Sequence, residues 1–477
     1  MLQKIYARRL KRAPIVISVC LALFAGIGLA RYYPGVSFGW LWPVGVLVAV
    51  TLRKHNVATL LCLALLGFGI GWWRGSVVMY RMAPYSQLAL TKVTVVGRAT
   101  DDAVYGEQSQ LTFGLSVVHV VQPVQTALPG TLKVSGYGVG GVYRGDRVVV
   151  SGKLYPTRGS NQASISFAEL KIVERGSSGI DAFRRNFAAG LQSALPEPLA
   201  SLGLGLLIGQ RSTLPAEVTS VLLTVGLTHI IAVSGYNLTI IIQAVRRLMG
   251  KRSKFQTMAV CLLLMGTFLL ITGSSPSIVR ASIISMLSLG VWYYGRTIKP
   301  LVLLLTAGAI SVLLTPLYLW GNVSWYLSFL AFFGVLVLAP LVTKRLYGRR
   351  TPKIIGQIVI ESSCAQIMTV PYVLYIFGHI SFVALPANVL VVAAVPLAML
   401  LSLIAGLAGM FMPIVAGWLA WPAACVLLYM LDVSSLLAEL PFAARNNTYS
   451  TATAMACAYG VIGFVAVLLW RRAGSAS

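Results

Sequence analysis

Long apolar runs separated by short polar segments dominate the chain. A helix of about 20 residues, at about 1.5 Å rise per residue, crosses the hydrocarbon core of a bilayer. The runs predict about twelve such helices. They lie at residues 14–30, 39–52, 57–74, 218–248, 256–273, 277–295, 300–316, 322–342, 355–377, 381–403, 414–437 and 452–470. We therefore expect an α-helical polytopic membrane protein.

One segment, residues 93–175, follows a different pattern. Alternating β-branched and polar residues predict five strands, separated by glycine-rich turns at 138–141 and 158–161. The predicted strands are 93–99, 110–118, 131–137, 146–154 and 164–173. Five short antiparallel strands fit a small closed β-barrel, and the OB-fold is the commonest five-stranded choice.

An amphipathic helix is predicted after the barrel, over residues 178–196. Its apolar positions are Ile180, Phe183, Phe187, Leu191 and Leu195, and its polar positions are Arg184, Arg185 and Gln192. Such a helix either lies in the membrane interface or packs on the barrel. The next apolar segment, residues 199–209, is too short to span a bilayer. A re-entrant or tilted element buried in protein is plausible there.

Composition supports a membrane protein. Hydrophobic residues make up 57% of the chain, charged residues 10%, and mean hydropathy is +0.81, which argues against a soluble protein. The six cysteines lie in apolar stretches without a CxxC pair, and the four histidines lack metal-ligand spacing. We therefore expect neither a metal nor another cofactor.

The charge balance is strongly basic, with 38 Lys and Arg against 12 Asp and Glu, a net charge of +26. Basic cytoplasmic loops explain part of this excess. Loops at 4–12, 53–55, 246–254, 296–299, 344–353 and 471–472 share one side if the spans alternate. Both termini are then cytoplasmic, the first span is retained, and the barrel is extracytoplasmic. The remaining excess leaves room for a surface that attracts a polyanion.

A polar segment, residues 226–237, interrupts the apolar stretch 218–249. Histidine, serine and asparagine are costly near mid-membrane unless they face protein or water. Gly235 permits a positive φ, while Ser234 and Asn237 can satisfy freed backbone groups, so a helix break is expected at 234–237. Three roles stay open for His229: a buried histidine bonded to a carbonyl, a contact to a translocating polyanion, or a general base.

Three further polar interruptions occur at residues 209–215, 274–282 and 361–371, the last followed by 385–388. Each places Gly or Pro beside hydrogen-bonding side chains. Freed backbone groups survive inside a membrane where they line a cavity or meet protein partners. Several broken helices together indicate a permeation path.

The motifs resemble the ComEC family of DNA-uptake channels of bacterial competence. They are GLLIGQRSTLP (205–215), GLTHIIAVSGYNL (226–238), SPSIVRASI (275–283), VSWYLSFLAFFGVL (323–336) and AQIMTVPYVLYIFGHISFVALPANVL (365–390). The resemblance implies N-terminal transmembrane helices at 1–78, an extracytoplasmic OB domain at 92–176, the interfacial helix at 178–196 and the channel domain at 199–472. Many relatives add a metallo-β-lactamase-type domain. This sequence offers no HxHxDH cluster, so a short form without nuclease activity is expected.

Candidate path residues come from the interruptions. They are Arg211, His229, Ser234, Gly235, Tyr236, Asn237, Pro276, Arg280, Gln366, Pro371 and Asn388. Arg211 and Arg280 either snorkel to the interface or bind phosphate. Glu361 and Asp432 either pair with a basic residue or relay protons.

Bases and aromatics also combine in the barrel. They are Lys133, Tyr137, Tyr143, Arg144, Arg147, Lys153 and Arg158. Stacking and phosphate attraction hold single-stranded nucleic acid on such a surface. A merely solvated face is the alternative.

The leading hypothesis is a non-enzymatic channel in the cytoplasmic membrane that imports single-stranded DNA during natural transformation. Its expected partners, besides DNA and lipids, are an extracytoplasmic DNA receptor, a cytosolic DNA-translocating ATPase or single-stranded-DNA-binding protein, and a separately encoded nuclease. A proton-coupled small-solute transporter is the alternative. An intramembrane serine hydrolase using Ser234 with His229 or His379 is disfavoured, because positions 229 and 234 of one helix face different directions.

Overall fold

The computed structural model describes residues 12–35, 45, 57–105, 110–123, 125–156, 161–176, 178–210, 213–231, 235–250, 252–273, 276–297, 299–348 and 352–474. The chain divides into two compact units. Unit 1 comprises Met1–Ser177 and Ser282–Tyr326, and unit 2 comprises Ser178–Ala281 and Leu327–Ser477. Arg158, Arg211 and Ser234 of the predicted sites lie outside the described residues.

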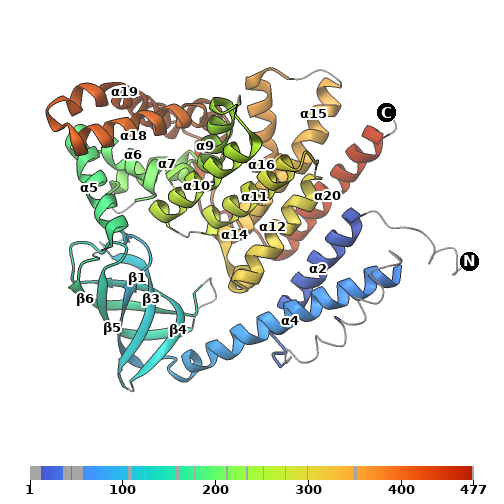
Figure 1. The fold of residues 1–477 in the computed structure, drawn as a ribbon, viewed down its shortest axis with the longest axis horizontal. Helices are drawn as coiled ribbons and strands as arrows, with labels where there is room; N and C mark the ends of the chain where they lie inside the picture. The colour runs from blue at the N-terminus through green and yellow to red at the C-terminus, as the bar shows by residue number, and fades with distance from the viewer. Residues whose placement is uncertain are drawn as a thin grey trace, which may run out of the picture. The chain divides into compact units, whose positions relative to one another are not determined.

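Unit 1 contains the β-barrel seen in Figure 1. Its strands are β1 (Lys92–Ala99), β3 (Leu111–Gln122), β4 (Thr126–Tyr137), β5 (Arg147–Pro156) and β6 (Ala163–Glu174), with a short β2 (Val104–Tyr105) beside β3. The order β1-β5-β6-β4-β3 is closed by pairing of β3 with β1. Every pair in this ring is antiparallel except β4 with β6. The predicted five-stranded barrel is confirmed, and its connectivity agrees with the expected OB-fold.

Alternation along the strands builds the barrel core. Successive side chains of a strand point to opposite faces, so every second residue enters the interior. Leu115, Leu132, Val150, Leu154 and Ile165 are each 0% exposed. Burial of such side chains contributes about 1.5–3 kcal/mol each and accounts for the period-2 signal in the sequence.

The helices of unit 1 pack through glycines. They are α2 (Arg12–Ala30), α4 (Val57–Gln87), α12 (Pro300–Leu314) and α13 (Leu317–Gly321). A Cβ on Gly26 would lie 2.1 Å from the Phe68 carbonyl oxygen, and one on Gly71 would lie 2.3 Å from the Leu23 carbonyl oxygen. Small residues permit such close backbone approach, as is common between membrane helices.

Unit 2 is helical and includes most of the family-like motifs. Its elements are α5 (Gly179–Ala194), α6 (Leu199–Ile208), α7 (Ala216–Thr224), α8 (Thr228–Ile231), α9 (Gly235–Leu248), α10 (Lys254–Thr272), η3 (Gly334–Leu338), α15 (Ala339–Tyr347), α16 (Ile354–Phe377), α17 (Ala384–Val391), η4 (Val392–Ala394), α18 (Val395–Phe411), α19 (Pro413–Ala438) and α20 (Ala452–Gly474), with paired β7 (Ile380–Ser381) and β8 (Ala444–Arg445). Helices α11 (Pro276–Tyr293) and α14 (Val323–Phe333) run across the unit boundaries in sequence.

The core of unit 2 surrounds α6, which is a short helix buried in protein, as predicted. Nine of its ten residues are buried. Helix α5 packs on α6, α18 and α19 through Phe187 and Leu191. The prediction that Arg184 lies on the polar face of α5 is wrong. Arg184 is 7% exposed, because its guanidinium reaches inward and donates to the Ile271 carbonyl oxygen at 2.6 Å.

Eight helices among the described residues are long and apolar enough to cross a membrane. They are Ala13–Ala30, Thr59–Gln87, Lys254–Thr272, Val323–Tyr347, Ile355–Phe377, Ala384–Phe411, Pro413–Ala438 and Ala452–Arg471. Leu199–Ile208, Ser277–Tyr293 and Pro300–Leu314 are shorter apolar helices. The count of about twelve spans stays a prediction, and most of the predicted span 39–52 lies outside the described residues.

The predicted single span 218–248 is wrong, because the segment is divided into α7, α8 and α9. Helix α7 ends at Gly226, whose φ of +75° is left-handed. The Gly226 amide donates to the Leu223 carbonyl oxygen and the Leu227 amide to that of Leu222, at 3.0 and 2.8 Å. This is a Schellman termination, so the chain already turns at Gly226, ahead of the helix break expected at 234–237.

The interruption expected at 361–371 is also wrong. Helix α16 runs without a break from Ile354 to Phe377, and Pro371 lies inside it. A proline is tolerated within a membrane helix where neighbouring groups satisfy the freed carbonyl. The helix ends instead at Gly378, which is left-handed with a φ of +61°.

Candidate functional site

The broken segment α7–α8–α9 is tied to the surrounding helices by side-chain contacts to carbonyl groups. Asn237, in the first turn of α9, is 1% exposed, and its Nδ2 donates to the Leu206 carbonyl oxygen at 3.0 Å. The last four carbonyls of a helix have no intrahelical partner, and Leu206 is among those of α6. Asn237 therefore joins the start of α9 to the end of α6.

His379 makes a second contact to this segment, a structural role that was not predicted from the sequence. Its Nε2 lies 3.1 Å from the Leu223 carbonyl oxygen at the end of α7, and its Nδ1 lies 2.6 Å from the Asn446 side-chain amide. A carbonyl requires an N–H, so Nε2 carries the proton. The atom of Asn446 at Nδ1 is Oδ1, which is also a hydrogen-bond acceptor.

His229 lies on the short helix α8, within the break. Its Nδ1 is 3.1 Å from the Gly226 carbonyl oxygen, and its side chain is exposed. The contact to a carbonyl of a broken helix is the one expected for a structural histidine, but that role was predicted for a buried side chain.

Arg280 is the most unusual residue of the predicted path. It lies in the second turn of α11, is 2% exposed, and its guanidinium carbon is 5.6 Å from the Phe329 ring centroid and 4.9 Å from that of Phe332. Its Nε and Nη1 have no hydrogen-bond partner within the described part of the chain. The two rings stabilise the faces of the cation. These two N–H groups remain unsatisfied in the described structure.

The other path residues are distributed over several elements. Gly235 and Tyr236 begin α9, Pro276 begins α11, Gln366 and Pro371 lie in α16, and Asn388 lies in α17. Asn388 also has a buried, unpaired atom, Oδ1, in the described structure. Buried polar atoms without partners are rare and costly, and in the described structure Arg280 and Asn388 share this feature with Thr213, Ser282 and Ser402.

The acids of the proposed proton relay have separate surroundings. Glu361, on α16, accepts a hydrogen bond from Gln357 Nε2 at 2.8 Å, one turn earlier on the helix. Asp432 is exposed on α19. Within the described ranges neither acid forms an ion pair, and no group of three His, Cys, Asp or Glu could hold a metal ion.

The predicted DNA-binding residues of the barrel do not form one cluster. Arg147 begins β5, directly after the loop with Tyr143 and Arg144. Lys153 lies six residues further along β5, about 20 Å away at about 3.3 Å per residue. Lys133 is in register with Ser164 of β6, which is in register with Tyr155. Lys133 and Lys153 therefore lie toward one end of the barrel, and the other three toward the opposite end.

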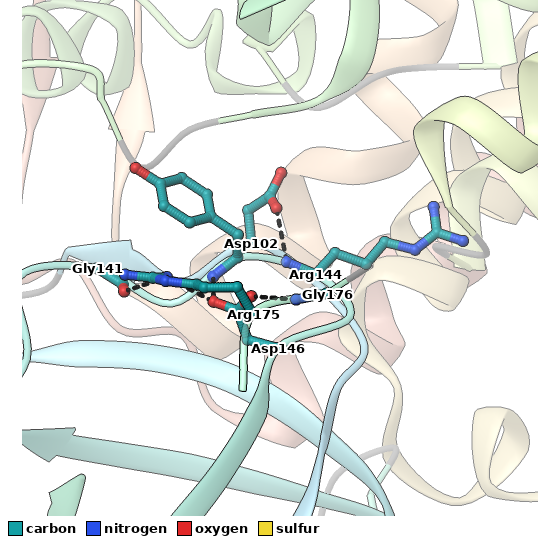
Figure 2. Close-up of polar contacts among 7 residues, drawn as sticks. Asp102, Gly141, Arg144, Asp146, Arg175 and Gly176 are labelled. Carbon is teal, nitrogen blue, oxygen red and sulfur yellow. Dashed lines mark hydrogen bonds and ion pairs between the residues drawn. The ribbon is translucent and has the colours of Figure 1, made fainter. Parts of the chain in front are cut away.

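The loop end of the barrel is organised by Asp146, as Figure 2 shows. Asp146 is 0% exposed. Its Oδ1 accepts from the Gly176 amide at 2.9 Å, and its Oδ2 accepts from the Tyr143 amide at 3.0 Å and from Arg175 Nη1 at 2.6 Å. Nearby, Asp102 Oδ1 accepts from the Arg144 amide at 2.9 Å. Tyr143 and Arg144 thus contribute backbone groups to a structural network.

Comparison with known proteins identifies the family. The family described as "Competence protein" matches residues 206–472, which is more than half of the chain. A curated relative, "ComE operon protein 3" of Bacillus subtilis (strain 168), is 26% identical over 229 residues, which cover 47% of this chain and 28% of the relative. The chain thus spans little more than a quarter of that relative's length. No solved structure matches significantly. With its apolar helices and ordered motifs, the chain belongs to the ComEC family of competence proteins.

Proposed function

We propose that this chain forms a passage for single-stranded DNA across the cytoplasmic membrane during natural transformation. Family membership supports a role in competence, and the eight apolar helices support a location in a membrane. A passage for DNA must stabilise a phosphate polymer in a medium of low dielectric constant. Cations, backbone amides and helix ends are the groups that can do so.

The observation that carries the proposal is the unpaired guanidinium of Arg280. A buried charge is costly unless it is paired, and Arg280 Nε and Nη1 are both unbonded within the described structure. Nε–H and Nη1–H lie in the plane of the guanidinium, and each can donate a hydrogen bond to a phosphate oxygen. The guanidinium is covered in this conformation, so a phosphate reaches it only when the Phe329 or Phe332 side chain moves.

The broken segment supplies a second group of contacts. The left-handed turn at Gly226 and the exposed His229, which contacts the Gly226 carbonyl oxygen, belong to this segment. We propose that this segment lines the passage, together with Arg211, Ser234, Tyr236 and Gln366. The hydrogen bonds of Asn237 to the Leu206 carbonyl and of His379 to the Leu223 carbonyl keep the broken segment in place while the DNA passes.

The orientation and partners follow from the same proposal. Basic loops favour cytoplasmic termini and an extracytoplasmic barrel. A passage of this kind receives DNA from an extracytoplasmic receptor and delivers it to a cytosolic ATPase or single-stranded-DNA-binding protein. A separate nuclease removes the complementary strand. Glu361 and Asp432 are the candidates for coupling to protons.

The test is uptake of labelled DNA in cells that carry Arg280→Met, Arg280→Lys or wild-type protein at equal membrane levels. We expect Arg280→Met to reduce uptake by at least about tenfold. We expect Arg280→Lys to recover only part of it, because an ammonium cannot present two coplanar donors between the rings.

Ser282→Ala is the matched control, since Ser282 is on the same helix and its buried Oγ is also unpaired in the described structure. We expect this variant to keep normal uptake. Normal uptake by Arg280→Met would remove Arg280 from the passage and, with it, the principal support for a DNA channel.

A further inference from the structure

Phe167 is the extra residue of a β-bulge on the outer surface of the barrel. On the β5 side, Ser166 is in register with Lys153, and Glu169 is in register with Ser151. Strand β6 therefore advances three residues where β5 advances two. The β4 side shows the same excess between Ile165 and Ala168. Phe167 has a φ of +54° and is 77% exposed. A left-handed aromatic residue that projects its whole ring into solvent is rare and strained.

Two glycines on the neighbouring strands make room for this bulge. A Cβ on Gly136 of β4 would lie 2.2 Å from the Ala168 carbonyl oxygen. A Cβ on Gly152 of β5 would lie 2.6 Å from Ile165 Cγ2. Glycine inside a strand weakens it unless another backbone approaches closely. The sequence therefore accommodates the bulge from both sides, and bulges of this kind re-aim a side chain.

Two lysines lie beside the bulge in an arrangement that is unfavourable without a ligand. Lys92 of β1 and Lys153 of β5 are directly opposite one another in register, and both are exposed. Like charges in this position destabilise a sheet. On its other side Lys153 faces Ser166, and its Nζ lies 5.9 Å from the Tyr155 ring centroid. Within the described barrel, neither lysine forms an ion pair.

The barrel contains a second bulge that serves as a reference. Val117 of β3 has a φ of +50° and is 65% exposed, and the neighbouring Ser116 is in register with Arg98. Arg98 is opposite Arg147, so a like-charged pair is present here too. Arg147, however, is in register with Glu174 on its other side. Here the charge has an acidic neighbour and the projecting side chain has no π-face.

We propose that Lys92, Lys153, Tyr155 and Phe167 form a binding surface for single-stranded DNA. Phe167 stacks on a base, and the two lysines contact the adjacent phosphates. In its choice of DNA as ligand, this inference rests on the proposed function. The surface lies on the first, fourth and fifth strands of the ring, whereas OB-folds usually bind oligonucleotides on the second and third.

The surroundings of Phe167 favour DNA over a membrane surface. Membrane-binding faces present several apolar side chains together. Phe167 has Ser166 beside it and Glu169 two positions later on the same strand, and the lysines are on the adjoining strands. A projecting ring among cations, with Tyr155 beside Lys153, matches the combination of stacking and phosphate attraction that holds single strands.

The test is equilibrium binding of a fluorescent oligothymidylate to the full-length chain in detergent, at two salt concentrations. We expect Phe167→Asn, which tolerates the left-handed backbone, to weaken binding about tenfold, within the range of one lost stacking contact. Phe167→Tyr keeps a ring and should bind normally. Replacing Lys92 and Lys153 together by Gln should weaken binding and lower the salt slope by about one to two.

Val117→Asn is the matched control and should leave binding unchanged. Equal binding by wild type and Phe167→Asn, or an equal loss in Val117→Asn, would overturn the proposed surface while leaving the channel untouched. If the wild-type chain binds no oligonucleotide at all, the proposed function fails with it. In the membrane arm, Phe167→Trp is placed in vesicles that contain brominated anionic lipid. Additional tryptophan quenching by the lipid, without quenching by oligonucleotide, would assign the surface to the membrane instead.

Discussion

Two buried charges, Asp146 in the barrel and Arg280 in the helical unit, have opposite surroundings. Asp146 is 0% exposed and accepts from two backbone amides and from Arg175 (Figure 2). Arg280 is 2% exposed, is flanked by two phenyl rings, and lacks partners for Nε and Nη1 in the described structure. Both charged groups are buried away from water. In the described structure, protein hydrogen-bond donors replace water around the Asp146 carboxylate, whereas Arg280 Nε and Nη1 have no such partner.

Under the proposed function, this difference separates a structural charge, Asp146, from one that meets a ligand, Arg280. Asp146 joins the loop before β5 to the segment after β6, so its carboxylate contributes to folding. Within the described structure, Arg280 Nε and Nη1 have no hydrogen-bond partner, and only the two phenyl rings partly offset the desolvation of the cation. The two residues should therefore respond to substitution with opposite signs.

The largest expected effect is the loss of barrel stability in Asp146→Ala. Two amides, of Tyr143 and Gly176, lose this acceptor, and each unsatisfied buried group costs about 1–3 kcal/mol. We expect the free energy of unfolding to fall by about 2–5 kcal/mol. Protection of barrel amides from hydrogen exchange in the detergent-solubilised chain measures this change. Asp101→Ala, an exposed acid, should remain within about 0.5 kcal/mol of wild type. Equal losses would mean that burial of Asp146 is immaterial.

The second effect has the opposite sign. Arg280→Met replaces an unpaired buried cation by an apolar side chain that can pack between Phe329 and Phe332. Such replacements are neutral or stabilise by about 1–4 kcal/mol. We expect the thermal midpoint of the solubilised protein to stay equal or rise. In contrast, Arg184→Met should lower it, because Arg184 donates to the Ile271 carbonyl oxygen. A fall in Arg280→Met as large as in Arg184→Met would make Arg280 structural as well.

The comparison also explains how far the sequence could be interpreted. The strands of the barrel were predicted because burial of every second residue, as at Leu132 and Val134, leaves a local period-2 pattern. The termination at Gly226 also has a local signal, a glycine flanked by Leu222 and Leu227, but the surrounding apolar run concealed it. The bulge at Phe167 leaves no periodic pattern in the sequence, so it could not be predicted.

The partners of the site residues could not be predicted, because they come from distant segments. Asn237 meets a carbonyl 31 positions away, and His379 meets one 156 positions away. No spacing rule relates such pairs. The sequence identified Arg280 by its polarity within an apolar run, but its enclosure by Phe329 and Phe332 depends on the packing of α11 against α14. The sequence therefore identified candidate site residues by their type, but it could not predict the groups that surround them.

A neutral polar residue should give an intermediate effect and sharpen the comparison. Asn237→Leu removes the donor to the Leu206 carbonyl oxygen, which then lies buried without this hydrogen bond. We expect a loss of about 1–3 kcal/mol in the free energy of unfolding, and weaker protection of α6 and α9 against hydrogen exchange. Gln243→Leu, at an exposed position of α9, is the control and should have no such effect. Unchanged protection in Asn237→Leu would show that the break is held by packing alone.

The smallest effect is expected for Arg175, the partner of Asp146. Its Nη1 lies 2.6 Å from Asp146 Oδ2, yet 53% of its side chain is exposed, so water screens the pair. Arg175→Leu leaves the carboxylate with both amide donors. We therefore expect a loss of about 1 kcal/mol or less, which shrinks further at high salt because exposed charges are screened. Lys171→Leu, an unpaired exposed position of β6 in the described structure, controls for removal of a charge. A loss in Arg175→Leu that equals the loss in Asp146→Ala would show that the ion pair, rather than the two amides, stabilises the buried carboxylate. The contrast between Asp146 and Arg280 would then depend on the presence of a single counter-ion.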